Sequence, residues 1–236
     1  MNNTANVIVD RYSESIHESL NILVVGATGG TGRATVEKLL NEGHNVTAFS
    51  RSANELINMS DQIITINGDV TNTTELDQVV KGQDVIIVTL GISENPMRVR
   101  ICGAVRTPSN VRSIGTRNVI TAMRKHGVPR LVVQSSYGVG ETRGLLRFVD
   151  QLFFNLILKP QIDDTERQEI EIRQSGVDWV IVQPVHLTDN DSNSFPFIST
   201  TGQTRLMKVA RKSVAKFLAL AAHESDYIGK SVAISG

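Results

Sequence analysis

The chain has 236 residues, of which 40% are hydrophobic and 20% are charged, a composition typical of a globular protein. Its 24 basic residues balance its 24 acidic residues, so it lacks the basic excess of nucleic-acid-binding proteins and no nucleic-acid partner is expected. No apolar run approaches the roughly 20 residues that a membrane span needs. The single cysteine, Cys102, precludes an intrachain disulfide, and we expect a cytoplasmic protein that does not bind membranes.

Apolar runs alternate with helical patterns along the chain, which predicts a single α/β domain with a doubly wound, mostly parallel Rossmann sheet and helices on both faces. We assign this domain to residues 21–236 and leave residues 1–20 as a leader without an assigned role. Strands are predicted at 22–25, 46–49, 63–66, 85–89, 131–134, 179–182 and 231–235. Helices are predicted at 34–43, 74–80, 111–125, 163–174 and 209–222, and an amphipathic stretch at 145–158. The loops 91–108 and 187–204, the second with a short strand near Phe197, are expected to border a substrate site.

A glycine-rich turn joins the first predicted strand to the first predicted helix. Gly26, Gly29 and Gly32 have the spacing at which glycines permit a tight bend, the approach of a pyrophosphate and close packing of helix on strand. The helix N-terminus then presents free N–H groups to the phosphates. A purely structural turn is the alternative, but the flanking strand and helix supply the context that the motif requires. The expected cofactor contacts in this turn are Gly26, Thr28, Gly29, Gly30, Thr31, Gly32 and Arg33.

The end of the second strand indicates which dinucleotide binds. NAD sites usually place an acidic residue there for the ribose hydroxyls, whereas this chain has Arg51 and no acid until Glu55. Arg51, assisted by Arg33, can form charge-assisted bonds to a 2′-phosphate, so the sequence predicts NADP(H). The alternative is that Arg51 and Arg33 are solvated surface residues that do not contact the cofactor. Asp69, after the third strand, can bond the adenine amino group or cap the next helix, and the sequence leaves both open.

Four segments together resemble a known family: GATGGTGR, the arginine after the second strand, NGDV, and SGVDWVIVQP. They resemble the atypical short-chain dehydrogenases of the NmrA-like group, most closely its flavin reductase/biliverdin reductase B family, over residues 21–235. The resemblance implies a serine beside the nicotinamide, at Ser136, and a Pro-x-His segment that ends at His186 and borders the substrate. These two residues are the catalytic candidates, although Ser136 can instead end the strand and His186 can be a stacking wall. The remaining expected cofactor contacts are Val70, Leu90, Gly91 and Ser135.

The chain departs from ordinary short-chain dehydrogenases in one respect that concerns proton transfer. Those enzymes use a Tyr-x-x-x-Lys pair, but Tyr137 is followed at the lysine position by Glu141, and Tyr12 and Tyr227 also lack the partner. A conjugated acceptor such as a flavin, quinone or tetrapyrrole can accept a hydride while solvent supplies the proton, so catalysis rests on holding donor and acceptor together. Three arginines in the first loop either face an anionic substrate or are solvated: Arg98, Arg100 and Arg106.

These observations favour an NADPH-dependent reductase of a small conjugated acceptor. The alternative from another class is a non-catalytic NADP(H)-binding redox sensor, and an assembly factor that keeps only the fold is a third. No metal site is predicted, because the histidines lack acids or cysteines at ligand spacing. The sequence leaves the oligomeric state open.

Overall fold

The computed structural model describes residues 18–91, 107–145 and 159–236 except residue 193. Within these ranges the chain forms an eight-stranded sheet of order β3-β2-β1-β4-β5-β6-β10-β8 and a small parallel pair, β7-β9. The strands are β1 (Asn21–Val25), β2 (Asn45–Ser50), β3 (Ile63–Asn67), β4 (Val85–Val88), β5 (Arg130–Gln134), β6 (Asp178–Pro184), β7 (His186–Thr188), β8 (Phe197–Ser199), β9 (Lys208–Ala210) and β10 (Lys230–Ser235).

The large sheet is parallel except at one edge, where β8 pairs antiparallel with β10. The chain runs outward from β1 to β3 and then returns to β4 on the other side of β1, so the strand order reverses between β1 and β4. Ligands of open parallel sheets bind at such a reversal, outside the carboxyl ends of the strands. The predicted doubly wound, mostly parallel fold is confirmed.

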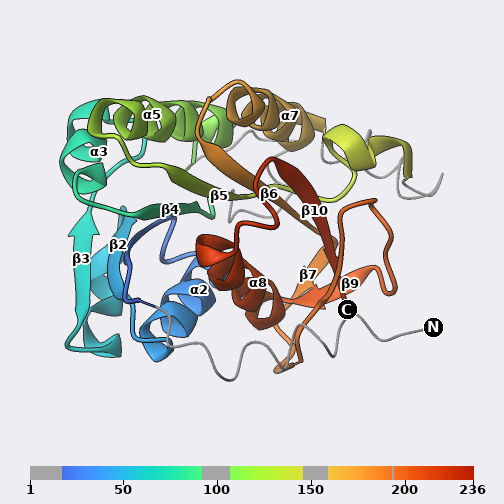
Figure 1. Cartoon of the computed structure of the whole chain (residues 1–236), viewed down its shortest axis with the longest axis horizontal. Coiled ribbons are helices and arrows are strands. Elements are labelled where there is room, and N and C mark those ends of the chain that lie inside the picture. The colour runs from blue at the N-terminus through green and yellow to red at the C-terminus, as the bar shows by residue number, and fades with distance from the viewer. Residues whose placement is uncertain (1–17, 92–106, 146–158, 193) are drawn as a thin grey trace.

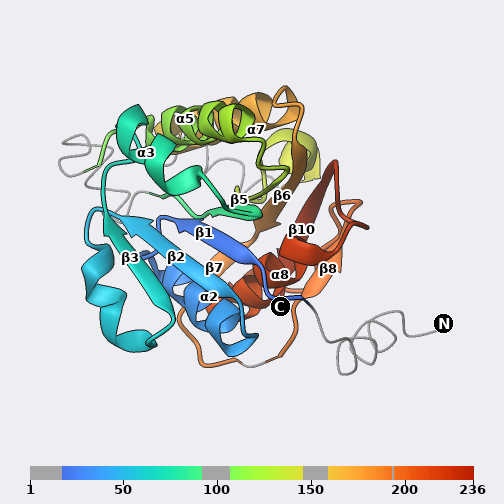
Figure 2. The ribbon, with the colours of Figure 1, turned by 60° about the vertical axis from the view of Figure 1, so that its left-hand side comes forward.

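Helices cover both faces of the sheet (Figure 1). Helices α2 and α8 pack against each other on one face, and α3, α5 and α7 cover the other, as Figure 2 also shows. Side chains of β1 alternate between the two layers: Val24 packs with Phe217 of α8, and Leu23 with Met123 of α5. Both faces of β1 are therefore buried, which explains its continuous apolar run. The helices are α2 (Gly30–Asn41), α3 (Thr73–Val80), α5 (Val111–His126), α7 (Lys159–Arg173), α8 (Arg211–His223) and the 3₁₀ helices η1 (Ala53–Met59) and η2 (Gly140–Leu145).

The short elements differ from the sequence prediction. Strands β7 and β9 have three residues each, too few for a periodic pattern, and neither was predicted. The last helix was predicted from 209, but Val209 and Ala210 pair with β7, so α8 begins at Arg211. The leader up to residue 17, most of the loop 91–108 and the stretch 146–158 lie outside the described residues. No helix in the described ranges is long and apolar enough to cross a bilayer.

Candidate cofactor pocket

A cavity of about 570 Å³ lies at the carboxyl ends of the central strands. Its volume falls within the roughly 300–1,000 Å³ of small-molecule and cofactor sites. The cavity extends from the ends of β2 and β3, past β1 and β4, to the end of β5. Ten of the expected cofactor contacts line it: Gly26, Thr28, Gly29, Gly30, Thr31, Arg51, Asp69, Val70, Leu90 and Gly91.

The glycine-rich turn has the geometry of a phosphate cradle. Gly26 has a φ of +83°, and a Cβ there would lie 2.9 Å from the Thr89 carbonyl oxygen, so only glycine suits this position. Gly29 caps α2 with φ −66° and has no side chain to occupy the N–H groups of the first turn. A Cβ on Gly32 would overlap the Gly26 carbonyl, because the helix packs directly on the turn. The first turn of α2 is therefore open to an anion at its positive end.

Hydroxyl groups connect the turn to the end of β2. The Thr28 hydroxyl donates to Ser50 Oγ at 3.1 Å and accepts from Ser52 Oγ at 3.5 Å. Beside them, the exposed Arg51 lines the pocket and donates from Nη2 to Thr107 Oγ1 at 3.0 Å. An arginine among serine and threonine hydroxyls supplies the donors that a phosphate monoester accepts.

Asp69 lies at the far end of the pocket, after β3. Its carboxylate accepts from the Thr71 N–H at 2.8 Å and from the Thr71 hydroxyl at 2.7 Å, and these bonds lower the pKa of Asp69. The N-terminus of α3 is instead capped by Asn72, whose side chain accepts from the N–H groups of Thr74 and Glu75. The interpretation of Asp69 as the helix cap is therefore wrong, and its carboxylate remains at the pocket wall as an ionised acceptor.

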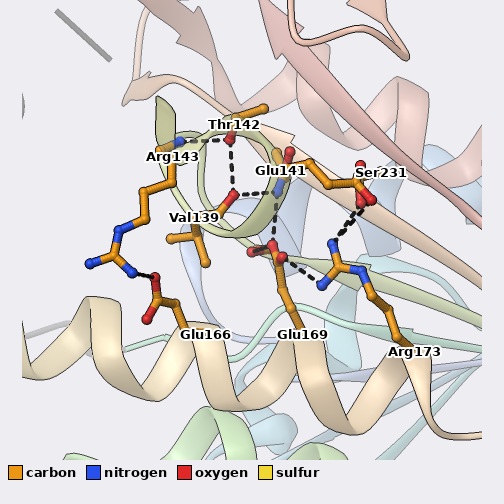
Figure 3. Close-up of polar contacts among 11 residues, drawn as sticks. Val139, Glu141, Thr142, Arg143, Glu166, Glu169, Arg173 and Ser231 are labelled. Carbon is orange, nitrogen blue, oxygen red and sulfur yellow. Dashed lines mark hydrogen bonds and ion pairs between the residues drawn. The ribbon is translucent and has the colours of Figure 1, made fainter. Parts of the chain in front are cut away.

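The hydroxyl groups of Ser135 and Tyr137 form hydrogen bonds to groups outside the pocket. Ser135 is buried, and its hydroxyl donates to Glu169 of α7 at 2.5 Å. The buried Glu169 also accepts from Gln183 Nε2 at 2.9 Å. Arg173 Nη1 donates to it at 3.0 Å (Figure 3). Tyr137 is buried and donates from its hydroxyl to the Gly202 carbonyl at 3.0 Å. Neither hydroxyl lines the cavity.

The two catalytic candidates and the remaining expected cofactor contacts lie outside the lining as well. Ser136 is partly buried, and its hydroxyl donates to the Tyr137 carbonyl at 3.3 Å. His186 is exposed at the start of β7, whereas the next residue, Leu187, lines the cavity. Arg33 is exposed on α2, and Gly32 is buried under the turn. Of the described residues at the β5 end, Gln134 is the one that reaches the cavity.

A family model described as NAD(P)H-binding matches residues 26–225, which include the whole glycine-rich turn and most of the sheet. The chain belongs to the NAD(P)H-binding family. NAD(P)H is therefore the cofactor of this protein.

Curated relatives of this NAD(P)H-binding protein are longer than the matched region. An uncharacterised chloroplastic protein of Arabidopsis thaliana is 30% identical over 176 residues, covering 73% of this chain and 61% of that protein. A 2-alkyl-3-oxoalkanoate reductase of Stenotrophomonas maltophilia is 32% identical over 120 residues, covering 51% of this chain and 34% of that protein. The matches thus span less than two thirds of the length of either relative.

Solved structures share the fold over nearly the whole chain. A short-chain dehydrogenase/reductase of Veillonella parvula, solved in complex with NADP, has a TM-score of 0.75 at 17% identity and covers 93% of this chain and 95% of that one. An anaerobillin reductase of Escherichia coli has a TM-score of 0.73 at 20% identity and covers 91% and 96%. At these identities the likeness shows the fold alone.

The NAD(P)H-binding protein also brings two arginines to the pocket that sequence reasoning missed. Arg211, at the start of α8, pairs with Asp189 and lies over the turn, where a Cβ on Gly30 would come within 2.7 Å of its Cδ. Arg112, the second residue of α5, lines the cavity beside Gly91. Arg211 comes directly after β9 and Arg112 is in the first turn of α5, and both are far in sequence from the glycine-rich turn, so only tertiary structure brings them to the pocket.

Proposed function

We propose that this protein is an NADPH-dependent reductase of the flavin reductase/biliverdin reductase B type. It transfers a hydride to a small conjugated acceptor and uses no tyrosine–lysine proton relay. When bound, NADPH supplies the hydride, and solvent supplies the proton that completes the reduction of the acceptor. The residues of the chain hold the phosphates, exclude bulk water and fix the acceptor over the strand ends.

The position of Tyr137 carries the proposal. Its hydroxyl is buried and bonded to the Gly202 carbonyl, and burial raises the pKa of Tyr137 from its ordinary value. In addition, Glu141, at the position of the relay lysine, is exposed on η2 and pairs with Arg173 at 3.8 Å (Figure 3). A tyrosine so placed is a poor proton donor near neutral pH, which favours an acceptor that needs no tyrosine acid.

A Tyr137→Phe variant should therefore retain a turnover rate within about threefold of the wild type, because no proton passes through the tyrosine. The loss of the hydrogen bond to Gly202 should lower stability by about 1 kcal/mol. Steady-state NADPH oxidation and urea unfolding measure the two effects separately. If a folded Tyr137→Phe protein turned over about 100-fold more slowly, a tyrosine-based mechanism would be established and the proposal contradicted.

The preference for NADPH rests on Arg51. Replacing it by alanine removes the charge-assisted contact to the 2′-phosphate and should cost about 1.5–3 kcal/mol of NADPH affinity, while NADH affinity stays unchanged. Nicotinamide fluorescence titrations of both cofactors measure this. Arg33→Ala is the matched control, because Arg33 is also exposed but lies outside the cavity lining. Equal affinities of the wild type for NADPH and NADH would refute the assignment.

Catalysis itself is tested by following NADPH oxidation with flavins, quinones and tetrapyrroles. Turnover of at least one class is the expected result. If NADPH binds tightly and no acceptor of the three classes is reduced, the reductase proposal is wrong, and the redox-sensor alternative explains the retained cofactor binding.

A further inference from the structure

Arg112 is a positively charged residue of the pocket. None of the cofactor contacts proposed above involves it. It is the second residue of α5 and lines the cavity at the end of β4, where a Cβ built on Gly91 would lie 3.3 Å from Arg112 Nη2. The backbone N–H groups of Arg112 and Ser113 donate to the carboxylate of Asp164 at 2.9 and 3.2 Å. Asp164 thus caps α5 through the main chain, and its bonds do not go to the guanidinium.

The guanidinium of Arg112 is left without partners for most of its donors. Its Nε and Nη1 are shielded from solvent and have no hydrogen-bond partner in the described part of the chain. Burial lowers the pKa of Arg112, and the nearby charge of Asp164 opposes that shift. An arginine nevertheless stays protonated in proteins, so the pocket contains a positive charge with unused donors.

The other arginines of the pocket have partners. Arg51 donates to Thr107, and Arg211 pairs with Asp189. The anionic groups of NADPH also have their own partners in the proposed function, since the turn holds the pyrophosphate and Arg51 the 2′-phosphate. The free donors of Arg112 therefore match an anion that does not belong to the cofactor.

We propose that Arg112 binds an oxyanion of the acceptor, a carboxylate or a phosphate, and so selects anionic acceptors over neutral ones. This inference rests on the reductase function proposed above. The planar guanidinium presents paired N–H donors that fit the two oxygens of such a group, which a lysine or a backbone amide does not offer. Arg112 lines the cavity beside Gly91, after β4, and Gln134 lines it at the end of β5. Acceptors of such sheets approach from these strand ends.

The test uses matched acceptors that differ only in the anion. FMN is compared with riboflavin, and biliverdin with its dimethyl ester, in the wild type and in Arg112→Met and Arg112→Gln. Two readouts are taken: KM and kcat for NADPH oxidation, and the Kd of each acceptor for the protein saturated with NADP⁺. Arg117→Met is the control, because Arg117 is on the same helix but exposed and paired with Glu171.

The wild type should bind at least one anionic acceptor more tightly than its neutral counterpart. Both Arg112 variants should bind that anionic acceptor about 10- to 100-fold more weakly. Binding of the neutral acceptor and of NADPH should change little, and the Arg117→Met control should bind all of them as the wild type does. A wild type without preference in either pair, or an equal loss for both members of a pair, overturns the inference. A loss confined to NADPH also overturns it and assigns Arg112 to a cofactor phosphate. If the wild type prefers the anionic acceptor but reduces neither member of the pair, the inference about Arg112 holds and the reductase function is refuted. If it reduces acceptors without preferring the anionic one, the reductase function holds and the inference about Arg112 is refuted.

Discussion

A Gly29→Val variant should fold as the wild type does and lose NADPH binding. Gly29 has φ −66° and ψ 157°, a conformation open to any L-residue, and the nearest atom to an added Cβ is the Gly26 carbonyl oxygen at 3.3 Å. The branched side chain would instead occupy the space above the first turn of α2. Losing two hydrogen bonds to a charged phosphate costs about 3–6 kcal/mol, which weakens binding on the order of 100-fold or more. Fluorescence titration with NADPH measures this loss.

Gly32→Ala is the informative comparison for this prediction. Its Cβ would overlap the Gly26 carbonyl and lie 2.8 Å from Thr89 Oγ1, so this smaller substitution should destabilise the fold itself. Thermal unfolding of the apoproteins distinguishes the two effects, since Gly29→Val should melt close to the wild type and Gly32→Ala well below it. NADPH binding by folded Gly29→Val at wild-type affinity would show that the turn does not hold the cofactor.

A Glu169→Ala variant should lose about 3 kcal/mol of folding free energy. Glu169 is 1% exposed and accepts hydrogen bonds from three side chains, those of Ser135, Gln183 and Arg173. Truncating it leaves buried donors without an acceptor and the Arg173 charge without its partner, and such losses cost far more than a surface pair contributes. For a chain of this size the melting temperature should fall by about 6–12 °C.

Glu166→Ala supplies a matched control on the same helix. Glu166 pairs with Arg143, whose side chain is 61% exposed, and solvent screens this pair (Figure 3). Its loss should cost less than about 1 kcal/mol. Urea unfolding of both variants gives the comparison, and similar free energies of unfolding for the two would mean that the buried network does not stabilise the fold.

The fold and the phosphate turn could be predicted from local sequence. Continuous apolar runs identify strands buried on both faces, and the glycine spacing between a strand and a helix identifies the turn. The asparagine that caps α3 shows where such reasoning fails at short range. Asp69 and Asn72 are both good capping residues three positions apart, and only the hydrogen bonds of the structure decide for Asn72.

The cavity residues near β5 and β7 could not be predicted in the same way. At the end of β5, strand alternation directs Ser135 toward Glu169 of α7, whereas Gln134 reaches the cavity. At β7 the same alternation places Leu187 at the cavity and leaves His186 exposed. A shift of one residue along a strand reverses the side that each side chain faces. At the ends of short strands the sequence alone does not determine which residues face the cavity.

The contact between Arg211 and Gly30 has a consequence for the newly made chain. Gly30 and Arg211 are separated by most of the sequence. At about 5–20 residues per second, the turn is therefore synthesised roughly 10–40 s before Arg211. During that interval a nascent chain carries the phosphate cradle without a finished pocket. A ligand stabilises only the state that binds it, in proportion to the logarithm of its concentration over Kd. NADPH should therefore protect the finished protein from unfolding and proteolysis, and give no such protection to chains that end before α8.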